Sequence, residues 1–268
     1  MSNIARIAGQ AANTLTKPLN VEEVFSTYLY EGNWDGGAAT TNQIVNGVDL
    51  STEGGLVWIK NRGQSNLTHR LFDSETSSGV TGFYNLSSAS TAAAGGPNTS
   101  MMSSFNSDGF TVGNNADVNS SYHAVTDYAS WTFRKAPKFF DVVTYTGTGS
   151  DLTIDHNLGS VPACIIIKCT SAVKSWVVYH RGVNGGVNPE NYALFLNTTD
   201  AQNDNLYFQD TAPTSTQFFL GDSAANENGQ THVAYLFAHN DGDAEFGPDG
   251  DADIIKCGSV SYNAGATV

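Results

Sequence analysis

The chain is short of positive charge. Its 268 residues include 12 Lys and Arg against 26 Asp and Glu, which gives a formal net charge of −14. Binding to nucleic acid depends on clustered basic side chains that neutralise phosphates, so this balance argues against a nucleic-acid partner. The shortage is greatest in residues 141–268, which hold 15 of the acidic side chains and four of the basic ones.

Cysteine and long apolar runs are also lacking. Cys164, Cys169 and Cys257 are too few and too irregularly spaced for a disulfide framework or a zinc site. No apolar run approaches the roughly 20 residues that span a bilayer, and the N-terminus lacks the pattern of a secretory signal. We therefore expect free thiols, synthesis in the cytoplasm and no membrane insertion.

Common catalytic motifs are missing as well. The chain has no GxSxG, HExxH, P-loop or dinucleotide fingerprint in a usable strand-to-helix context. Polysaccharide hydrolysis would need two carboxylates across a cleft, and the sequence does not locate such a pair. We therefore predict no enzymatic activity and no catalytic residue.

What the chain does contain favours β structure. Aromatic residues make up 11% and hydrophobic residues 40%, whereas charged residues reach only 14%. Glycine occurs 27 times, and Ser, Thr and Asn are abundant between short apolar segments. Short strands and many turns are typical of this composition. The polar run from Ser87 to Ser104 is interpreted as a long surface loop.

A repeat divides the chain. Tyr30 and Tyr145 begin similar series of segments 115 positions apart, and Tyr262 follows 117 positions later. A period above 100 residues indicates tandem domains, because solenoid repeats are much shorter. Each unit has enough candidate strands for a two-sheet antiparallel β-sandwich. The fold class predicted is therefore all-β, with two tandem sandwiches after a short, partly helical N-terminal arm.

The predicted boundaries follow from this repeat. Residues 1–27 form the arm, 28–138 the first sandwich and 139–251 the second, and 252–268 are a linker or the start of a truncated third unit. The stretch from Trp131 to Pro162 contains the seam between the sandwiches. Phe139 and Phe140 lie at this seam, and we expect both side chains to be buried near the junction.

Several strings in the chain resemble a known family. They are LVWIKNR, SFNSDGFTVG, WTFRKAPKFFDVVTYTGTGS, HNLGSVPACIIIK, DTAPTST, YLFAHN and DIIKCGS. These strings resemble a module of unknown biochemical activity that recurs in tandem in tail-fibre-like structural proteins of marine bacteriophages. The resemblance covers about residues 28–262. It implies a virion protein built from jelly-roll or concanavalin-like sandwiches, commonly assembled as trimers, and it supplies no catalytic residues.

The predicted function is accordingly that of a virion structural protein, a tail-fibre or related appendage subunit that contributes to host attachment. Its expected partners are other virion proteins, such as a tail adaptor, nozzle or collar, and further copies of itself in a homotrimer. The N-terminal arm is too small to bury its own apolar residues, so it either docks on the first sandwich or anchors the protein to the particle. The predicted anchoring residues are Ile4, Ile7, Leu15, Val21, Val24 and Phe25.

Binding of a host surface glycan is the alternative function, and degradation of host polysaccharide is a third. Aromatic side chains on loops stack on sugar rings in β-sandwich lectins, and the candidates here are Trp34, Tyr84 and Tyr122. Trp58, Trp131 and Trp176 lie within predicted strands and are expected in the core. His69 and His180, each followed by an arginine, occupy similar places in the two repeats and mark either a shared pocket or framework hydrogen bonds.

An acidic run near the C-terminus offers the one candidate metal site. Asp241, Asp243 and Glu245 imitate the first three ligand positions of a calcium loop. The glycine that such a loop requires is one place late, however, and no glutamate stands at the twelfth position. The favoured interpretation is a solvated linker, so no cofactor is expected and calcium is the remaining alternative.

Overall fold

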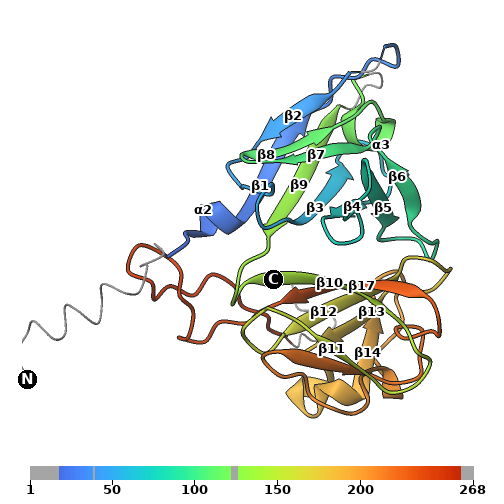
Figure 1. The fold of residues 1–268 in the computed structure, drawn as a ribbon, viewed down its shortest axis with the longest axis vertical. Coiled ribbons are helices and arrows are strands. Elements are labelled where there is room, and N and C mark those ends of the chain that lie inside the picture. Colours follow the sequence, from blue (N-terminus) through green and yellow to red (C-terminus); the bar gives the residue numbers. More distant parts are fainter. Residues whose placement is uncertain (1–17, 39, 122–125, 261–268) are drawn as a thin grey trace, which may run out of the picture.

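The computed structural model describes residues 18–38, 40–121 and 126–260, and its regular structure is mostly antiparallel β (Figure 1). The sheets form two groups along the chain, each consistent with a β-sandwich. A short helix, α2, precedes the first strand. The predicted all-β class with two tandem sandwiches is therefore confirmed. None of the helices within the described ranges has the length and apolarity of a membrane-spanning segment.

Module 1 is the group that runs from α2 to β9. Its elements are α2 (Val21–Val24), β1 (Phe25–Glu31), β2 (Asn42–Val45), β3 (Gly55–Asn61), β4 (Arg70–Asp73), β5 (Phe83–Ser87), β6 (Gly95–Asn98), β7 (Met102–Asn106), β8 (Gly109–Val112), α3 (Ala116–Asn119) and β9 (Asp127–Arg134).

Module 2 is the group that runs from β10 to β17. Its elements are β10 (Phe140–Thr146), β11 (Leu152–Asp155), β12 (Cys164–Cys169), β13 (Val177–His180), η1 (Val183–Gly186), η2 (Pro189–Asn191), β14 (Tyr192–Phe195), β15 (Asn203–Asp204), η3 (Leu206–Phe208), β16 (Gln217–Leu220) and β17 (Thr231–Phe237).

The two modules share one topology. The large sheet of module 1 has the order β1-β9-β3-β4-β5-β6, and that of module 2 has the order β10-β17-β12-β13-β14-β15. A small sheet accompanies each, β2-β8-β7 in module 1 and β11-β16 in module 2. Matching β1 to β10 makes every strand of the two large sheets correspond in turn, so the repeat in the sequence is a repeat of the fold.

Strand register defines which residues are counterparts. Phe25 pairs with Phe133 in module 1, and Phe140 pairs with Phe237 in module 2. On the next strand of module 1, Leu56 lies between Phe133 on one side and Asp73 on the other. On the matching strand of module 2, Cys164 lies between Phe237 and His180. His180 is therefore the counterpart of Asp73. The expected equivalence of His69 and His180 was wrong, because the similar strings are shifted in register, and Trp176 takes the place of His69.

Side chains that alternate along the strands give each large sheet two apolar faces. Val57 and Ile59 point toward the small sheet of module 1, where they join a core that contains Phe110. Leu56, which precedes Val57 in the strand, points to the opposite side and joins a different cluster. In module 2, Ile165 likewise packs inside its own module. The side chains next to it on the strand point to the other face of the sheet.

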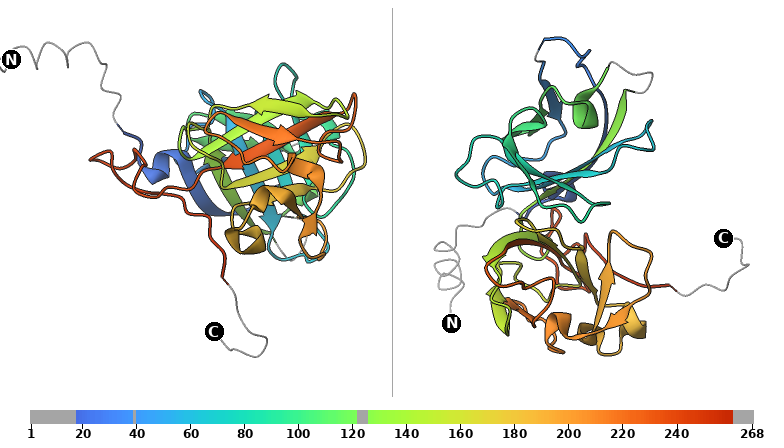
Figure 2. Two further views of the ribbon diagram at one scale, coloured as in Figure 1. Left: turned by 90° about the horizontal axis from the view of Figure 1, so that it is seen from below. Right: turned by 90° about the vertical axis from the view of Figure 1, so that its right-hand side faces the viewer.

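A junction core therefore lies between the two large sheets. Its fully buried members come from both modules and the segments beside them: Val24, Leu56, Leu71, Leu86, Ala136, Phe139, Phe140, Val142, Trp176, Val233, Tyr235, Ala244 and Phe246. The two large sheets therefore meet at the junction core, and the two modules lie one beyond the other (Figures 1 and 2). Each small sheet packs on the other face of its own large sheet.

Phenylalanine rings form the centre of the junction core. The ring centroid of Phe133 lies 5.3 Å from that of Phe237 and 5.5 Å from that of Phe140, and such aromatic pairs add about 0.5–1.5 kcal/mol each to the energy of burial. Phe139 and Phe140 are 3% and 0% exposed. Their burial agrees with the expectation from the sequence.

The segment before β1 belongs to the folded unit. Val24 is 0% exposed within the junction core, Phe25 packs against the core, and Gly247 N donates to Leu19 O. An arm that extends to residue 27 is therefore too long, since the sandwich begins at Phe25. Val21 is 43% exposed. Ile4, Ile7 and Leu15 lie outside the described residues.

Two other polar segments differ from their predicted roles. The run from Ser87 to Ser104 contains β6 and most of β7, and Ala94 N donates across the junction to Thr170 O, so it is more than a surface loop. After β17, residues 252–260 form no strand. Instead Ile254 N and Ile255 N both donate to the Asn240 side chain, which attaches this segment to module 2.

The junction core predicts how the protein unfolds. Phe140→Ala should lower the free energy of unfolding by about 3–5 kcal/mol, because it opens a cavity between both large sheets. Wild-type protein should unfold in one transition with coincident tryptophan fluorescence and circular dichroism in a urea titration. Val173→Ala, at a side chain that is 68% exposed, should change stability by less than about 0.5 kcal/mol. Two separate transitions in the wild type would contradict a shared core.

Candidate inter-module groove

A groove of about 520 Å³ lies where the two modules meet beyond the junction core. Module 1 contributes Glu75, Thr76 and Tyr84, and module 2 contributes Thr144, Tyr145, Thr146, Thr170, Ser171, Thr231 and His232. Most of these side chains carry a hydroxyl group. The groove is therefore a polar surface that neither module forms alone.

Strand alternation explains the hydroxyl-rich wall. Thr144 and Thr146 share a face of β10 with Phe140 and Val142, but they lie farther from the junction core and are exposed. Threonine suits this position because its branched side chain favours a strand while its hydroxyl remains in water. The apolar inner face of the large sheet thus continues outward as a polar wall.

The hydroxyl groups at the end of the wall are held in place. Thr170 Oγ1 lies 2.8 Å from Thr231 Oγ1 and 3.0 Å from Thr231 O. Ser171 Oγ donates to Gln230 Oε1 at 2.8 Å and accepts from Thr231 N at 2.9 Å. These bonds fix the positions of the oxygen atoms, so the wall offers an ordered set of donors and acceptors.

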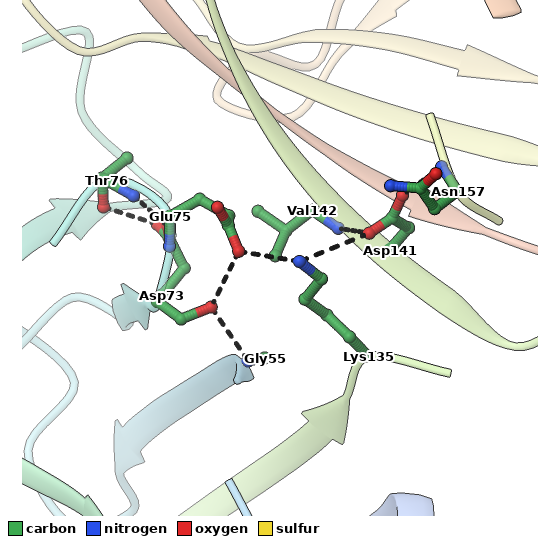
Figure 3. A network of polar contacts seen from close by, with 9 residues as sticks. Gly55, Asp73, Glu75, Thr76, Lys135, Asp141, Val142 and Asn157 are labelled. Atoms are coloured by element: carbon green, nitrogen blue, oxygen red, sulfur yellow. Dashed lines mark hydrogen bonds and ion pairs between the residues drawn. The ribbon is translucent and has the colours of Figure 1, made fainter. Parts of the chain in front are cut away.

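A charged network holds the module 1 side of the groove against module 2 (Figure 3). Lys135, in the connection between the modules, lies 2.8 Å from a Glu75 oxygen and 3.9 Å from an Asp141 oxygen. Asp141 also accepts hydrogen bonds from Val142 N and Asn157 N. Lys135 and Glu75 are partly exposed, so their pair adds little energy, but it sets the position of the Glu75 carboxylate.

A buried hydrogen bond crosses the junction beside this network. Tyr235 donates its hydroxyl to Asp73 Oδ2 at 2.8 Å, and both side chains are 1% exposed. Asp73 also accepts from Glu75 N and Thr76 N. Burial raises the pKa of Asp73 above its ordinary value, although these hydrogen bonds act in the opposite direction. The bond therefore ties β17 to the loop that supplies Glu75 and Thr76.

Lys168 forms a further polar contact across the junction. It is 0% exposed, and its Nζ donates to Thr91 O at 2.9 Å and to Lys174 O at 2.6 Å. Burial lowers the pKa of Lys168 to about 8. Trp176 nearby donates Nε1 to the carbonyls of Ser87 and Ser90. The ammonium group bonds to carbonyl oxygens of both modules, so it joins the modules at this point.

Two of the lining residues form a stacked pair. The rings of Tyr145 and His232 are 5.0 Å apart with an interplanar angle of 6°. Tyr30 and Tyr128, their counterparts in module 1, stack in the same way at 5.1 Å. His232 is 0% exposed, and burial lowers its pKa. The imidazole is therefore neutral in the folded protein near neutral pH.

Of the two predicted glycan-binding residues that the structure describes, Tyr84 lines this groove and Trp34 does not. Trp34 is half-buried in a distant turn, where its backbone pairs with Ser120 and Ser121 and its Nε1 donates to Gly37 O at 3.4 Å. Tyr122 lies outside the described residues. The structure therefore brings together Tyr84 and a set of hydroxyl groups that the sequence analysis did not identify.

The predicted calcium ligands do not form a metal site. Lys138 Nζ lies 2.8 Å from Glu245 Oε1 and 2.7 Å from the backbone oxygen of Asp243, and Lys256 Nζ lies 3.6 Å from Asp241 Oδ1. In the part of the chain that the structure describes, no group of three His, Cys, Asp or Glu residues could hold a metal ion. Lys138, which is distant in sequence, and Lys256, which follows the acidic run, thus lie against its negative charges.

The lining of the groove consists mainly of hydroxyl groups. Glu75 is the one carboxylate among its lining residues, whereas glycoside hydrolysis uses two. Hydroxyl groups and a tyrosine ring are the groups by which proteins contact sugars through hydrogen bonds and stacking. A neutral, hydroxylated ligand therefore fits the lining.

Comparison with known families identifies the chain. Residues 21–254 match the family described as a domain of unknown function (DUF7483), and the protein belongs to this family. The match begins at α2 and ends in the segment that packs against the junction core, so a single family unit includes both modules. No curated protein and no solved structure matched the chain in these comparisons.

The neutral, buried His232 predicts a dependence of stability on pH. The unfolded chain takes up a proton below the ordinary histidine pKa near 6.5, whereas the folded protein resists this protonation, so stability falls as the pH drops from 7 to 5. One proton that binds the unfolded chain but not the folded protein makes the free energy of unfolding change by up to about 1.4 kcal/mol per pH unit. His232→Asn, which can keep a donor to Gln230 O, should reduce the slope in urea titrations. An unchanged slope would contradict this role of His232.

Proposed function

We propose that the protein is a structural component of a bacteriophage virion, a tail-fibre or related appendage subunit that contributes to host attachment. The observation that carries the proposal is the junction core, which unites two sandwiches into one unit through fully buried residues of both. The resemblance of its strings to tandem modules in tail-fibre-like proteins supports the same role. An appendage of this kind needs stable connections between its modules.

The connection between the modules supports stiffness. Few residues separate β9 from β10, and within them Ala136 N donates to Phe140 O while Lys138 N donates to Leu158 O. Modules that share only a small polar contact usually move relative to each other. Here apolar packing, a buried Tyr235–Asp73 hydrogen bond and the Lys168 contacts all oppose such motion.

In this proposal the N-terminal arm attaches the protein to the particle. Its partner there is a tail adaptor, nozzle or collar protein. Because Val24 and Phe25 belong to the folded unit, a deletion that tests the arm should end at residue 17. The deletion of residues 1–17 should leave the folding of both modules intact but prevent incorporation into particles, as measured by the protein content of purified virions. A deletion of residues 261–268 is the matched control. Normal incorporation without residues 1–17 would overturn the anchoring role.

Recognition of a host glycan is the second candidate function, and the inter-module groove is the observation that favours it. Tyr84 and the hydroxyl-rich wall formed by Thr144, Thr146 and Thr231 line one continuous hollow. The groups in the groove can stack on a sugar ring and exchange hydrogen bonds with its hydroxyl groups. A fibre subunit with this groove can serve both structure and attachment.

A glycan array tests the second candidate. Tyr84→Ala should weaken binding at least tenfold, or about 1.4 kcal/mol, because it removes the aromatic surface of the groove. Tyr28→Ala serves as the matched control, since Tyr28 is exposed on β1 and does not line the groove. Trp34→Ala tests the other described aromatic candidate in the same assay. Equal binding by wild type and Tyr84→Ala would exclude the groove as the glycan site.

A further inference from the structure

A second hollow, of about 720 Å³, is formed by module 2 alone. Small-molecule sites in proteins have volumes of roughly 300–1,000 Å³. The inter-module groove lies beyond the Cys169 end of β12, whereas this hollow lies at the Cys164 end of the same strand. We call it the module 2 pocket, and the residues that define its chemistry are Ser160, Tyr179, Arg181, His239, Asp241 and Asp243.

The equivalent place in module 1 is also hollowed. Arg181 N donates to Ala163 O at 2.8 Å, and Ser74 N donates to Gly55 O at 3.1 Å, so Arg181 is the counterpart of Ser74. Ser74 lines a hollow of about 460 Å³ in module 1, where its Oγ accepts from Gly55 N at 3.1 Å. The shared fold therefore leaves a hollow at this place in each module, but the side chains that line it have diverged.

Tyr179 brings to the module 2 pocket a hydroxyl group that the fold does not require. Its ring packs in the core of module 2 and is 4% exposed. Its counterpart in module 1 is Phe72, which is 0% exposed, so this core position accepts a ring without a hydroxyl. A buried tyrosine hydroxyl usually has a hydrogen-bond partner, but that of Tyr179 has none among the described residues. Burial, followed by the charge of Glu190, raises the pKa of Tyr179 to about 12, so the hydroxyl stays protonated.

Three other residues of the pocket have donor groups without protein partners. Ser160 Oγ is buried and has no hydrogen-bond partner within the described ranges. His239 Nδ1 accepts from Cys257 N at 3.0 Å, so the ring proton of the neutral imidazole is on Nε2. The Arg181 side chain is exposed and forms no ion pair in the part of the chain that the structure describes. A ligand that accepts hydrogen bonds would satisfy these groups.

Carboxylates at the pocket supply acceptors and balance its charge. Asp241 and Asp243 are exposed, and Lys256 Nζ lies 3.6 Å from Asp241 Oδ1. With Arg181 and Lys256 on the positive side, these groups leave the pocket with little net charge. An anionic ligand would lie close to both carboxylates, and a cationic ligand close to the guanidinium. A neutral ligand whose groups both donate and accept fits better, and each hydroxyl of a sugar does both.

We propose that the module 2 pocket binds one unit of a neutral saccharide. Hydroxyl groups of the sugar accept hydrogen bonds from Ser160, Tyr179 and Arg181 and donate hydrogen bonds to Asp241 and Asp243. This site is separate from the glycan site proposed in the inter-module groove, because the two share no lining residue. The proposal depends neither on that groove nor on a role in a virion.

Titrations followed by saturation-transfer NMR test the proposal on the full chain, with glucose, galactose, mannose and N-acetylglucosamine as neutral probes. The wild type should bind at least one of them. Arg181→Ser, which copies the module 1 counterpart, should weaken this binding at least about tenfold, because a charged donor is lost. Tyr179→Phe should weaken it about threefold to tenfold, because one hydrogen bond is lost. Tyr207→Phe, at a half-buried tyrosine of module 2 outside the pocket, is the matched control and should bind like the wild type.

Urea titrations should show that both pocket variants fold like the wild type, since Arg181 is exposed and Phe72 fills the place of Tyr179 in module 1. Weaker binding in both variants, with Tyr207→Phe unaffected, would support the pocket as the site.

The inter-module groove is distinguished by Tyr84→Ala in the same titrations. If Tyr84→Ala loses binding while Arg181→Ser and Tyr179→Phe bind like the wild type, the sugar lies in the groove and the pocket proposal is wrong. The reverse result would support the pocket and reject the groove for that sugar. A wild type that binds none of the neutral probes would overturn the proposal, as would binding of only the charged sugars glucuronic acid or glucosamine.

Discussion

The structure depends on burying both faces of its large sheets. In an ordinary antiparallel sandwich one face of each sheet packs inward and the other meets water. Here β3 carries Val57 and Ile59 toward its own small sheet and Leu56 toward the other module. Each module alone would expose an apolar surface, and packing the two large sheets together removes most of that surface from water. The packing of the two large sheets at the junction core follows from this requirement.

Polar contacts around the junction core determine how one module is oriented on the other. Apolar packing alone tolerates small rotations of one sheet on another, whereas the Tyr235–Asp73 hydrogen bond and the Lys168 contacts need particular positions on both modules. These groups are buried, so a misaligned arrangement would leave them without partners at a cost of about 1–3 kcal/mol each. The relative position of the modules, and hence the shape of the groove between them, is thereby specified.

The repeat has diverged where its two copies have different neighbours. Val142 and Tyr235 are covered, while their counterparts Thr27 and Trp131 face outward. Module 1 covers this part of module 2, whereas module 2 covers only the other end of the equivalent face of module 1, around Leu56 and Leu71. The same part of the large sheet is therefore buried at the junction in module 2 and exposed to solvent in module 1.

The fold class and the central position of Phe139 and Phe140 could be predicted from the chain, because alternation of apolar residues and turn chemistry act over short distances. The candidate site could be predicted only in part. Tyr84 was identified by residue type, but the hydroxyl groups opposite it come from distant strands whose neighbours no local pattern reveals.

The sequence by itself determined that this protein consists of two similar β-sandwiches, since the repeat and the strand periodicity are local properties. Only the tertiary structure decided which faces of those sandwiches meet. Trp58 and Trp131 are as apolar as Trp176, yet Trp176 is fully buried and the other two are not. That difference arises because module 1 packs on module 2, a contact between residues far apart in the chain.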